Sequence, residues 1–288
     1  MGKRSKRLKE KVTEANSQGT PSRIYSSYDV VGDIAIIKVP DNSVEEAKKA
    51  AEAIMSLYHN LKSVFLQTSQ ISGDFRVRQL KCLVGQASTV TVHREAGCIF
   101  KVDVEKCYFS PRLQFELARI AGLVQRGEVV VNMFAGVGCF SVEIAKKASA
   151  SKVYSIDINP DAFEYMKENI RLNRVFGKVV PLLGDAKEVV GGLQGVADRV
   201  LMPLPEKALE YLPYAVKTLK PSGGWIHFHA FEHAPQRADA IEKTKLKVQD
   251  ALAGLNYSFG YSRLLRSTGP NWYQVVLDIC LNGSASKF

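Results

Sequence analysis

The spacing of hydrophobic positions changes character near residue 105. Before that point, short apolar runs are separated by Gly and polar turns, which is typical of strands. One longer segment has a helical period and starts at Ser43, whose hydroxyl can form a capping box with Glu46. The pattern predicts a small α+β domain over residues 24–105, with a helix at 43–59 and strands at 32–39, 62–67, 74–84, 89–94 and 98–104.

After residue 105, helical and strand periods alternate along the chain. A helix is predicted over residues 111–126, because apolar side chains recur there at helical spacing. From Glu128 onward, alternation of strands and helices predicts an α/β domain over residues 106–288, with a mostly parallel sheet and helices on both faces. The strands are expected at 128–133, 151–157, 178–184, 197–202, 223–230, 256–266 and 272–281, and the helices at 138–148, 160–173, 205–219 and 235–254.

The segment Val129–Phe140 carries the clearest chemical signal. A β-branched run meets Phe134, Gly136 and Gly138 and then a helical pattern, so backbone N–H groups and the helix dipole can hold an anionic group. A second strand ends in Asp157 about 20 residues later, and an acid there can bind both hydroxyls of a ribose. The pair predicts a nucleotide-like cofactor, with a purely structural turn as the alternative. Because no third glycine follows at the dinucleotide spacing, S-adenosylmethionine fits better than a dinucleotide.

In an open parallel sheet, ligands bind outside the carboxyl ends of the strands. Those ends carry residues 134–138, Asp157, Asp185 and residues 202–205, so we expect them to line one crevice. Asp185 can accept a hydrogen bond from an adenine amino group.

Two further features allow more than one interpretation. His227, His229 and His233 have a spacing that can hold a metal ion, but alternation within one strand gives the same pattern, and no metal is predicted. Trp272 can stack on an unpaired base or pack in the core.

The charge balance indicates a polyanionic partner. The 288-residue chain carries a net charge of +10, and six of its first eleven residues are Lys or Arg. We expect residues 1–23 to form a disordered basic arm that adds contacts to nucleic-acid phosphates. A single solvated basic face is the alternative.

The sequence also bears on location. No apolar run reaches the ~18–20 residues of a membrane span, and no hydrophobic signal region follows the basic N-terminus. The five cysteines are scattered without a CxxC spacing, which is typical of reduced thiols in a cytosol. We expect a cytoplasmic protein that does not bind membranes.

Seven longer motifs lie between about residues 28 and 279: VVGDIAIIKVP (30–40), SGDFRVR (72–78), KCYFSPRLQFE (106–116), NMFAGVGCFS (132–141), SIDINPDA (155–162), GDAKEV (184–189) and DRVLMPLPE (198–206). Through them the chain resembles the archaeal and eukaryotic-type tRNA (guanine-37-N1)-methyltransferases. The related wybutosine-pathway aminocarboxypropyltransferases usually differ at residues 108–112. The resemblance implies a class I (Rossmann-like) methyltransferase domain after a smaller tRNA-contacting domain. The family's usual N-terminal recognition domain has no expected counterpart here.

The resemblance implies a cofactor role for each matching residue. Asp157 and Ile158 would hold the ribose of S-adenosylmethionine, and Asp185 and Ala186 would hold its adenine. Tyr108 would pack near the methionine end. The rest of the cofactor cleft is expected from Phe134, Gly136, Gly138, Pro203, Leu204 and Pro205.

The same resemblance implies two catalytic residues. Glu116 matches the family's proposed general base, and Arg76 matches the residue that holds the guanine edge. N1 of guanine carries a proton that must leave as the methyl group arrives, and a carboxylate within reach can take it. Arginine can stabilise the charge that develops on guanine O6. For Glu116 the alternative is a solvated glutamate favoured by the helix dipole. RNA contacts are expected from Arg76, Arg112 and Trp272.

Four positions depart from the family pattern. Asn132 replaces an aspartate, Cys139 a common proline and Leu117 a frequent arginine. Pro203 stands where the family has asparagine, and proline has neither an N–H nor a side-chain amide for the target base. The pocket is therefore expected to read a different base, such as a wyosine precursor at position 37, or to bind guanine less tightly.

These inferences predict an S-adenosylmethionine-dependent tRNA methyltransferase that acts on N1 of guanosine 37, or on a tricyclic guanine derivative there. The base would be flipped out of the anticodon loop. The partner is tRNA, no obligate protein partner is predicted, and a monomer is expected. Two alternatives stay open: transfer of a 3-amino-3-carboxypropyl group, and a non-catalytic RNA-binding protein.

Overall fold

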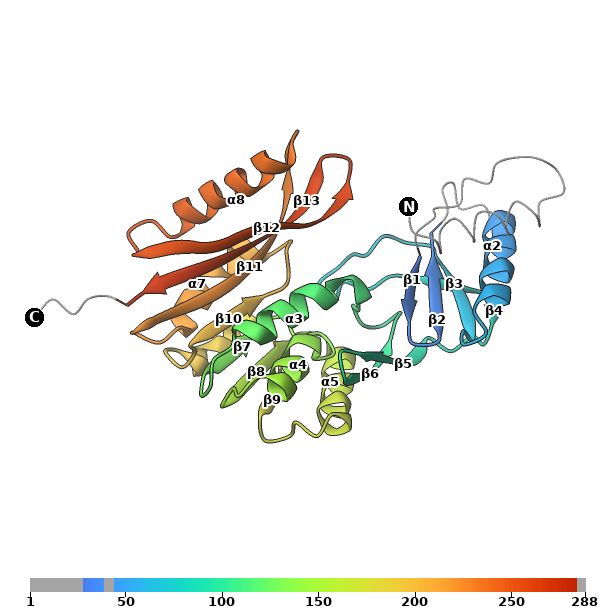
Figure 1. Ribbon diagram of the computed structural model, residues 1–288, viewed down its shortest axis with the longest axis horizontal. Coiled ribbons are helices and arrows are strands. Elements are labelled where there is room, and N and C mark those ends of the chain that lie inside the picture. Colours follow the sequence, from blue (N-terminus) through green and yellow to red (C-terminus); the bar gives the residue numbers. More distant parts are fainter. Residues whose placement is uncertain (1–27, 39–43, 284–288) are drawn as a thin grey trace, which may run out of the picture. The chain divides into compact units, whose positions relative to one another are not determined.

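The structure is a computed structural model that describes residues 28–38 and 44–283. The chain forms two compact units, residues 1–116 and 117–288. Figure 1 shows the order of the helices and strands in each. The predicted arm (1–23) and the capping residue Ser43 lie outside the described residues. No helix in the described part of the chain is long and apolar enough to cross a membrane.

The first unit contains a four-stranded sheet with the helix α2 (Val44–Leu57) packed against it. The strand order is β1-β2-β3-β4, and β2 and β3 run parallel because α2 carries the chain between them. Small side chains on α2, such as Ala47, Ala50 and Ala51, are fully buried, and they let the helix approach the sheet closely. The strands are β1 (Asp29–Val31), β2 (Ile34–Ile37), β3 (Ser63–Gln67), β4 (Leu80–Gly85) and, in a separate hairpin, β5 (Val90–Glu95) and β6 (Cys98–Asp103).

The β5–β6 hairpin is hydrogen-bonded to the turn between β1 and β2. The N–H of Gly32 donates to Nδ1 of His93 over 3.1 Å, and the N–H of Asp33 donates to Oγ1 of Thr91 over 3.1 Å. Gly32 has a φ of 57°, and a Cβ atom there would lie 2.1 Å from Oγ1 of Thr91. Glycine is therefore required at this close approach.

The predicted strand at 74–84 is wrong in its first half. Strand β4 begins only at Leu80, and residues 72–77 form a turn. Gly73 (φ 72°) and Arg76 (φ 53°) both lie in the left-handed region, which a strand cannot include.

The second unit is built on a seven-stranded sheet of order β12-β13-β11-β10-β7-β8-β9. Strands β11, β10, β7, β8 and β9 run parallel, and β12 and β13 add an antiparallel hairpin at one edge. The predicted α/β fold with a mostly parallel sheet is confirmed. The chain moves outward from β7 through β8 to β9 and then returns to β10, which creates a topological switch between β7 and β10. The strands are β7 (Val129–Asn132), β8 (Lys152–Asp157), β9 (Val179–Leu183), β10 (Arg199–Met202), β11 (Gly223–His233), β12 (Tyr257–Gly269) and β13 (Trp272–Asn282).

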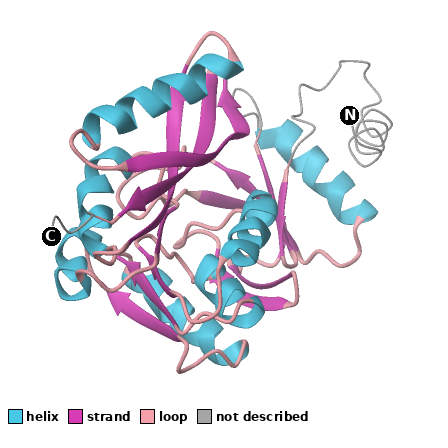
Figure 2. Cartoon of the chain, turned by 60° about the vertical axis from the view of Figure 1, so that its left-hand side comes forward, coloured by secondary structure: helices cyan, strands magenta, loops and turns pink. Residues whose placement is uncertain are grey.

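Helices pack on both faces of the large sheet (Figures 1 and 2). On one face, Leu212 of α7 and Val248 of α8 share a core with Phe228. The neighbouring residue, His229, points to the opposite face because strand side chains alternate, and there it meets the ring of Phe140 edge-on. The helices are α3 (Gln114–Leu123), α4 (Cys139–Lys147), α5 (Pro160–Leu172), α6 (Ala186–Val189), α7 (Ala208–Thr218) and α8 (Arg237–Ala251).

Two helical regions differ from the prediction. The helix expected at 111–126 begins with a 3₁₀ turn, η2 (Pro111–Leu113), and ends with α3 at Leu123. Between β9 and β10, α6 and the 3₁₀ turn η3 (Val190–Leu193) form where no helix was predicted. Four-residue segments are too short to display a helical period, so the hydrophobic pattern could not reveal them.

A chain of polar groups, buried at its centre and partly buried at its two ends, crosses the large sheet. Arg199 on β10 donates to Nε2 of His227 on β11 over 2.7 Å, so Nδ1 carries the imidazole proton and donates to Asp278 on β13 over 2.6 Å. Arg119 on α3 binds the same carboxylate at 2.5 and 3.0 Å, and Glu128 binds Arg199 at 3.0 and 3.1 Å. Burial lowers the pKa of His227, so the ring is neutral within this chain of charges.

Asp278 should stabilise the second unit in a pH-dependent way. Burial alone raises the pKa of Asp278, but hydrogen bonds from His227 and Arg119 outweigh it and bring that pKa down to about 2 from 3.8. The native protein should therefore lose this contribution as the pH falls from about 4 to about 2. We expect Asp278→Asn to lower the free energy of unfolding by about 3 kcal/mol at neutral pH, because the partly buried Arg119 and the buried His227 lose their carboxylate partner.

Urea denaturation of both proteins at neutral and acid pH measures this effect. Asp239→Asn, at an exposed position in the first turn of α8, is the matched control and should change little. Equal losses in the two variants would contradict the role given to Asp278.

Candidate cofactor and acceptor site

The loop after β7 is organised by the side chain of Asn132. This residue is fully buried, its Oδ1 accepts the N–H of Phe134 at 3.3 Å, and its Nδ2 donates to Oγ of Ser141 on α4 at 3.2 Å. The amide thus ties the start of the loop to the helix that follows it.

Asp157 closes the glycine turn from the end of β8. Its Oδ2 accepts the N–H of Gly136 at 2.6 Å, and its Oδ1 accepts the N–H of Asn159 at 3.0 Å. Burial raises the pKa of Asp157, and these two hydrogen bonds oppose the rise. Gly138 has a φ of 93°, and a Cβ atom there would lie 3.1 Å from Cγ of Met166, so the turn requires glycine.

Two large apolar side chains stand exposed beside Asp157. Ile158 follows it directly and is 41% exposed, and Leu183, which pairs with Asp157 from β9, is 49% exposed. Exposed apolar groups at the carboxyl ends of parallel strands suit a flat ring such as adenine. Leu183 was not among the residues predicted from the sequence, although its position at the end of the third predicted strand, 178–184, indicates a place at the cofactor edge of the sheet.

Asp185 is anchored from two sides at the end of β9. Its carboxylate caps α6 by accepting the N–H of Lys187 at 2.9 Å, and it accepts the hydroxyl of Tyr211 at 2.9 and 3.1 Å. The ring of Tyr211 meets that of Phe134 edge-on, with centroids 5.0 Å apart. Tyr211 therefore joins two predicted cofactor loops, and Ala186 is buried beside it in the same core cluster. Tyr211 was not predicted as a site residue, because it lies 26 residues after Asp185 in an amphipathic helix and no local pattern connects the two.

Pro203, Leu204 and Pro205 directly follow β10 at the topological switch of the sheet. The first two are half-buried, and Pro205 is buried. Their backbone therefore lies on the sheet edge that carries Asp157 and Asp185, as the prediction of a common crevice requires.

In the first unit, two predicted site residues are in contact. The guanidinium of Arg76 lies over the ring of Tyr108, 4.2 Å from its centroid, in a cation–π arrangement. The turn that holds Arg76 is closed by a hydrogen bond from the backbone N–H of Arg76 to the carbonyl of Gly73 at 3.1 Å.

Arg112, which is predicted to contact RNA, forms an ion pair with Asp29 at 2.7 Å.

Glu116 is fully buried in the first turn of α3. The alternative of a solvated glutamate at a helix N-terminus is therefore wrong. Its catalytic role stays a prediction, as do the binding roles of the other site residues.

The structure also bears on the metal site considered for the three histidines and on the two roles considered for Trp272. Both ring nitrogens of His227 are engaged by Arg199 and Asp278, and the described residues contain no group of His, Cys, Asp and Glu that could hold a metal ion. Trp272 is 47% exposed and lies against the ring of His233, so it is not a core residue.

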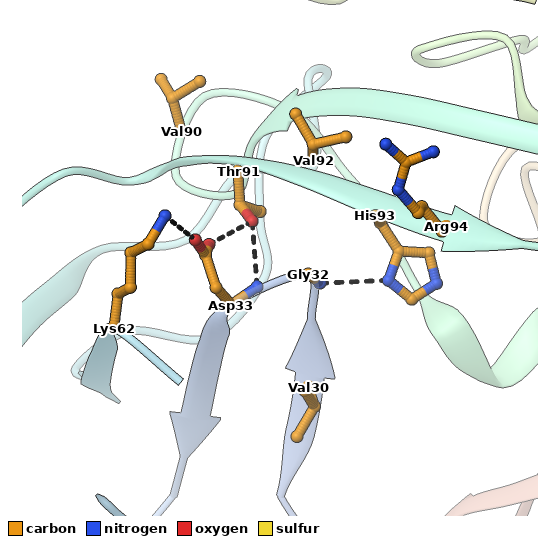
Figure 3. A pocket seen from close by; sticks show the side chains of 9 residues that line it. All are labelled: Val30, Gly32, Asp33, Lys62, Val90, Thr91, Val92, His93 and Arg94. Carbon is orange, nitrogen blue, oxygen red and sulfur yellow. Dashed lines mark hydrogen bonds and ion pairs between the residues drawn. The ribbon is translucent and has the colours of Figure 1, made fainter. Parts of the chain in front are cut away.

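The first unit also contains an open hollow of about 530 Å³ (Figure 3). The carboxylate of Asp33 is satisfied locally, since it forms an ion pair with Lys62 at 2.7 Å and accepts a hydrogen bond from Thr91 at 2.6 Å. None of the predicted site residues lines it. The lining residues are Val30, Gly32, Asp33, Lys62, Val90, Thr91, Val92, His93 and Arg94.

A parallel sheet with a switch between β7 and β10, a glycine turn after β7 and an acid at the end of β8 together define a class I methyltransferase fold. Residues 91–253 match the family described as the TRM5/TYW2 methyltransferase domain, and residues 6–89 match the TYW2 N-terminal domain. The chain belongs to the TRM5/TYW2 methyltransferase family, as its sequence motifs predict.

Curated relatives cover most of the chain. The tRNA (guanine(37)-N(1))-methyltransferase Trm5b of Pyrococcus abyssi is 39% identical over 261 residues, which span 88% of this chain and 74% of that protein. The tRNA 4-demethylwyosine(37)-methyltransferase Taw21 of Saccharolobus solfataricus is 35% identical over 260 residues, which span 90% of this chain and 95% of that protein.

Solved structures agree with the fold. The complex of aTrm5 and tRNALeu has a TM-score of 0.80 and 35% identity, covering 96% of this chain and 76% of that chain. TYW2 of M. jannaschii in complex with AdoMet has a TM-score of 0.64 and 30% identity, covering 89% of this chain and 100% of that chain.

Tyr211→Phe tests the link between the two cofactor loops. We expect the free energy of unfolding to fall by about 1 kcal/mol, because Asp185 loses a hydroxyl donor. Binding of S-adenosylmethionine should weaken severalfold, because the loop that carries Asp185 and Ala186 is less well held. Isothermal titration and thermal denaturation measure both effects. Tyr214→Phe, one turn further along α7, is the control, and an equal loss of cofactor affinity there would count against the link.

Proposed function

We propose that this protein transfers a methyl group from S-adenosylmethionine to N1 of guanosine 37 in tRNA. The observation that carries the proposal is membership of the TRM5/TYW2 family, together with a glycine turn closed by Asp157 at the switch of the sheet. The similarity to the Pyrococcus abyssi Trm5b supports the acceptor atom and position.

The residues at the strand ends fit the cofactor. Asp157 presents a half-buried carboxylate for hydroxyl groups, Ile158 and Leu183 present exposed apolar surface for a ring, and Asp185 is held for an amino group. S-adenosylmethionine, when bound, supplies an electrophilic methyl group on a sulfonium.

Glu116 and Arg76 are proposed to act on the acceptor base. The N1 proton of guanine must leave as the methyl group arrives, and a carboxylate withdrawn from water is suited to accept it. Glu116 is such a group, because it is fully buried in α3. The Arg76 guanidinium, oriented by the Tyr108 ring, is suited to stabilise negative charge on O6 of the base.

The acceptor is proposed to be a flipped base of the tRNA anticodon loop, since an enzyme that modifies a base edge must take it out of the stack. The similar complex of aTrm5 with tRNALeu supports tRNA as the partner. We propose that the protein acts as a monomer in the cytoplasm, without an obligate protein partner.

A second acceptor, 4-demethylwyosine at position 37, is favoured by one residue. Pro203 lies at the end of β10 and offers the base neither an N–H nor an amide group, so it imposes fewer hydrogen bonds on the base edge. A relative that covers 90% of this chain is a 4-demethylwyosine methyltransferase. The protein is therefore proposed to accept the tricyclic base as well as guanine.

The test is methyl transfer to three matched tRNAs that carry guanosine, adenosine or 4-demethylwyosine at position 37. Nucleoside mass spectrometry should detect 1-methylguanosine from the first and a methylated wyosine base from the third. Equal labelling of the adenosine transcript would reject position 37. Methylthioadenosine in place of S-adenosylhomocysteine would favour aminocarboxypropyl transfer, and tRNA binding without any product would favour a non-catalytic role.

Glu116→Gln tests the general base. We expect kcat to fall by about 100-fold or more, because the amide cannot accept the N1 proton, while the dissociation constant for S-adenosylmethionine stays the same. Single-turnover methylation and isothermal titration measure the two quantities. Glu45→Gln, an exposed glutamate in the first turn of α2, is the control for a helix-dipole effect. If the two variants slowed methylation equally, Glu116 would not be the base.

A further inference from the structure

Part of the edge hairpin extends beyond the parallel sheet. The last residue of β10, Met202, pairs with Phe228, yet β11 continues to His233. This extension pairs only with β13, which in turn pairs with β12, and the three segments form a projecting ribbon. We define the ribbon as residues 229–233 of β11, 263–269 of β12 and 272–276 of β13. It begins next to the end of β10, where Pro203 follows Met202.

One face of the ribbon collects cationic and aromatic side chains. Arg266 pairs with Gln274, which pairs with Phe231 on β11. Trp272, two residues from Gln274 on the same strand, pairs with His233. Because side chains two residues apart on a strand share a face, these groups lie on one surface. Arg263, opposite Val276, belongs to the same face.

Arg266 is held in a defined orientation. Its Nε donates to Oε1 of Gln274 at 2.9 Å. Gln274 is only 3% exposed, so its own position is fixed by the surrounding residues. No other side-chain hydrogen bond or ion pair of Arg266 occurs within residues 28–38 and 44–283. Its two terminal nitrogens therefore remain for an external acceptor, and a fixed guanidinium fork matches the geometry of a phosphate group.

The same face carries a platform for a base, and no acid among the ribbon residues lies on it. Trp272 is half-exposed beside His233, with ring centroids 5.3 Å apart. Of the acids on these three strands, Glu232 points to the other face and binds Lys247 at 2.6 Å. Asp278 is already bound by His227 and Arg119. Among the ribbon residues, the exposed part of this face thus presents Arg266, Trp272 and His233, a cationic and aromatic pattern that binds single-stranded nucleic acid.

We propose that the ribbon binds a nucleotide that flanks the acceptor base, with its phosphate on Arg266 and its base stacked on Trp272. The inference rests on the proposed function, because the occupant is the single-stranded loop of the substrate RNA. It assigns to the ribbon the task of holding the RNA chain beside the base that is flipped out.

The first experiment measures binding of an anticodon stem-loop at several salt concentrations. Arg266→Ala should weaken binding and reduce the slope of log Kd against log salt by about 0.7, as expected for one lost phosphate contact on a single strand. Arg171→Ala, an exposed arginine at the end of α5, removes the same charge elsewhere and should leave the slope unchanged. An unchanged cofactor affinity shows that each variant is folded.

The second experiment measures stacking. Trp272→Ala should raise KM for tRNA and Kd for the stem-loop about tenfold with little change in kcat, whereas Trp272→Phe should retain most of the affinity. A fluorescent purine analogue placed on either side of position 37 should be quenched by the wild-type protein and not by Trp272→Ala.

The outcomes separate this inference from the proposed function. If the wild-type protein methylates guanosine 37 but Arg266→Ala and Arg171→Ala behave alike, the ribbon does not hold the RNA while the proposed function stands. If polyglutamate of matched charge displaces the stem-loop as well as RNA does, the ribbon is a site for acidic protein instead. If the wild-type protein binds no tRNA, both proposals fail.

Discussion

The polar chain Glu128–Arg199–His227–Asp278–Arg119, whose three central members are buried, is the constraint on which the second unit depends. Glu128, just before β7, binds β10, and the other contacts join β10 to β11, β11 to β13 and β13 to α3, so these elements are tied at fixed points. A slip of one residue in any of these strands would turn its polar group to the opposite, apolar face and leave a charge unpaired. The register that this chain fixes also decides how far β11 extends beyond β10, and therefore where the ribbon with Arg266 and Trp272 begins.

In the cofactor loops, too, polar side chains fix the backbone through hydrogen bonds. Asp157 and Asp185 are proposed to bind the cofactor, yet each already has a structural function: one holds the glycine turn, and the other caps α6 and binds Tyr211. Groups that are fixed before a ligand arrives lose less conformational entropy when it binds. Asn132 acts similarly within the loop after β7, where its amide binds the backbone of Phe134 and the hydroxyl of Ser141.

Much of the fold was predictable because its signals are local. The glycine turn, the acid at the end of β8 and the proline at the start of α5 each occupy the place that the sequence indicates. The errors also have local causes. Phe75 and Val77 alternate as in a strand, but Gly73 and Arg76 adopt left-handed conformations that turn the backbone. The segment α6 was missed because four residues cannot show a period.

The sequence by itself determined the order of strands and helices, the residues at the strand ends and the family, since hydrophobic period and motif spacing are written along the chain. Only the tertiary structure decided that Tyr211 binds Asp185, that Glu116 is fully buried, that His227 is enclosed between Arg199 and Asp278, and that Gln274 orients Arg266. The physical reason is that these contacts depend on which strands become neighbours and in what register. Strand neighbours and register follow from the packing of the whole unit, so they cannot be inferred from the sequence of any single segment.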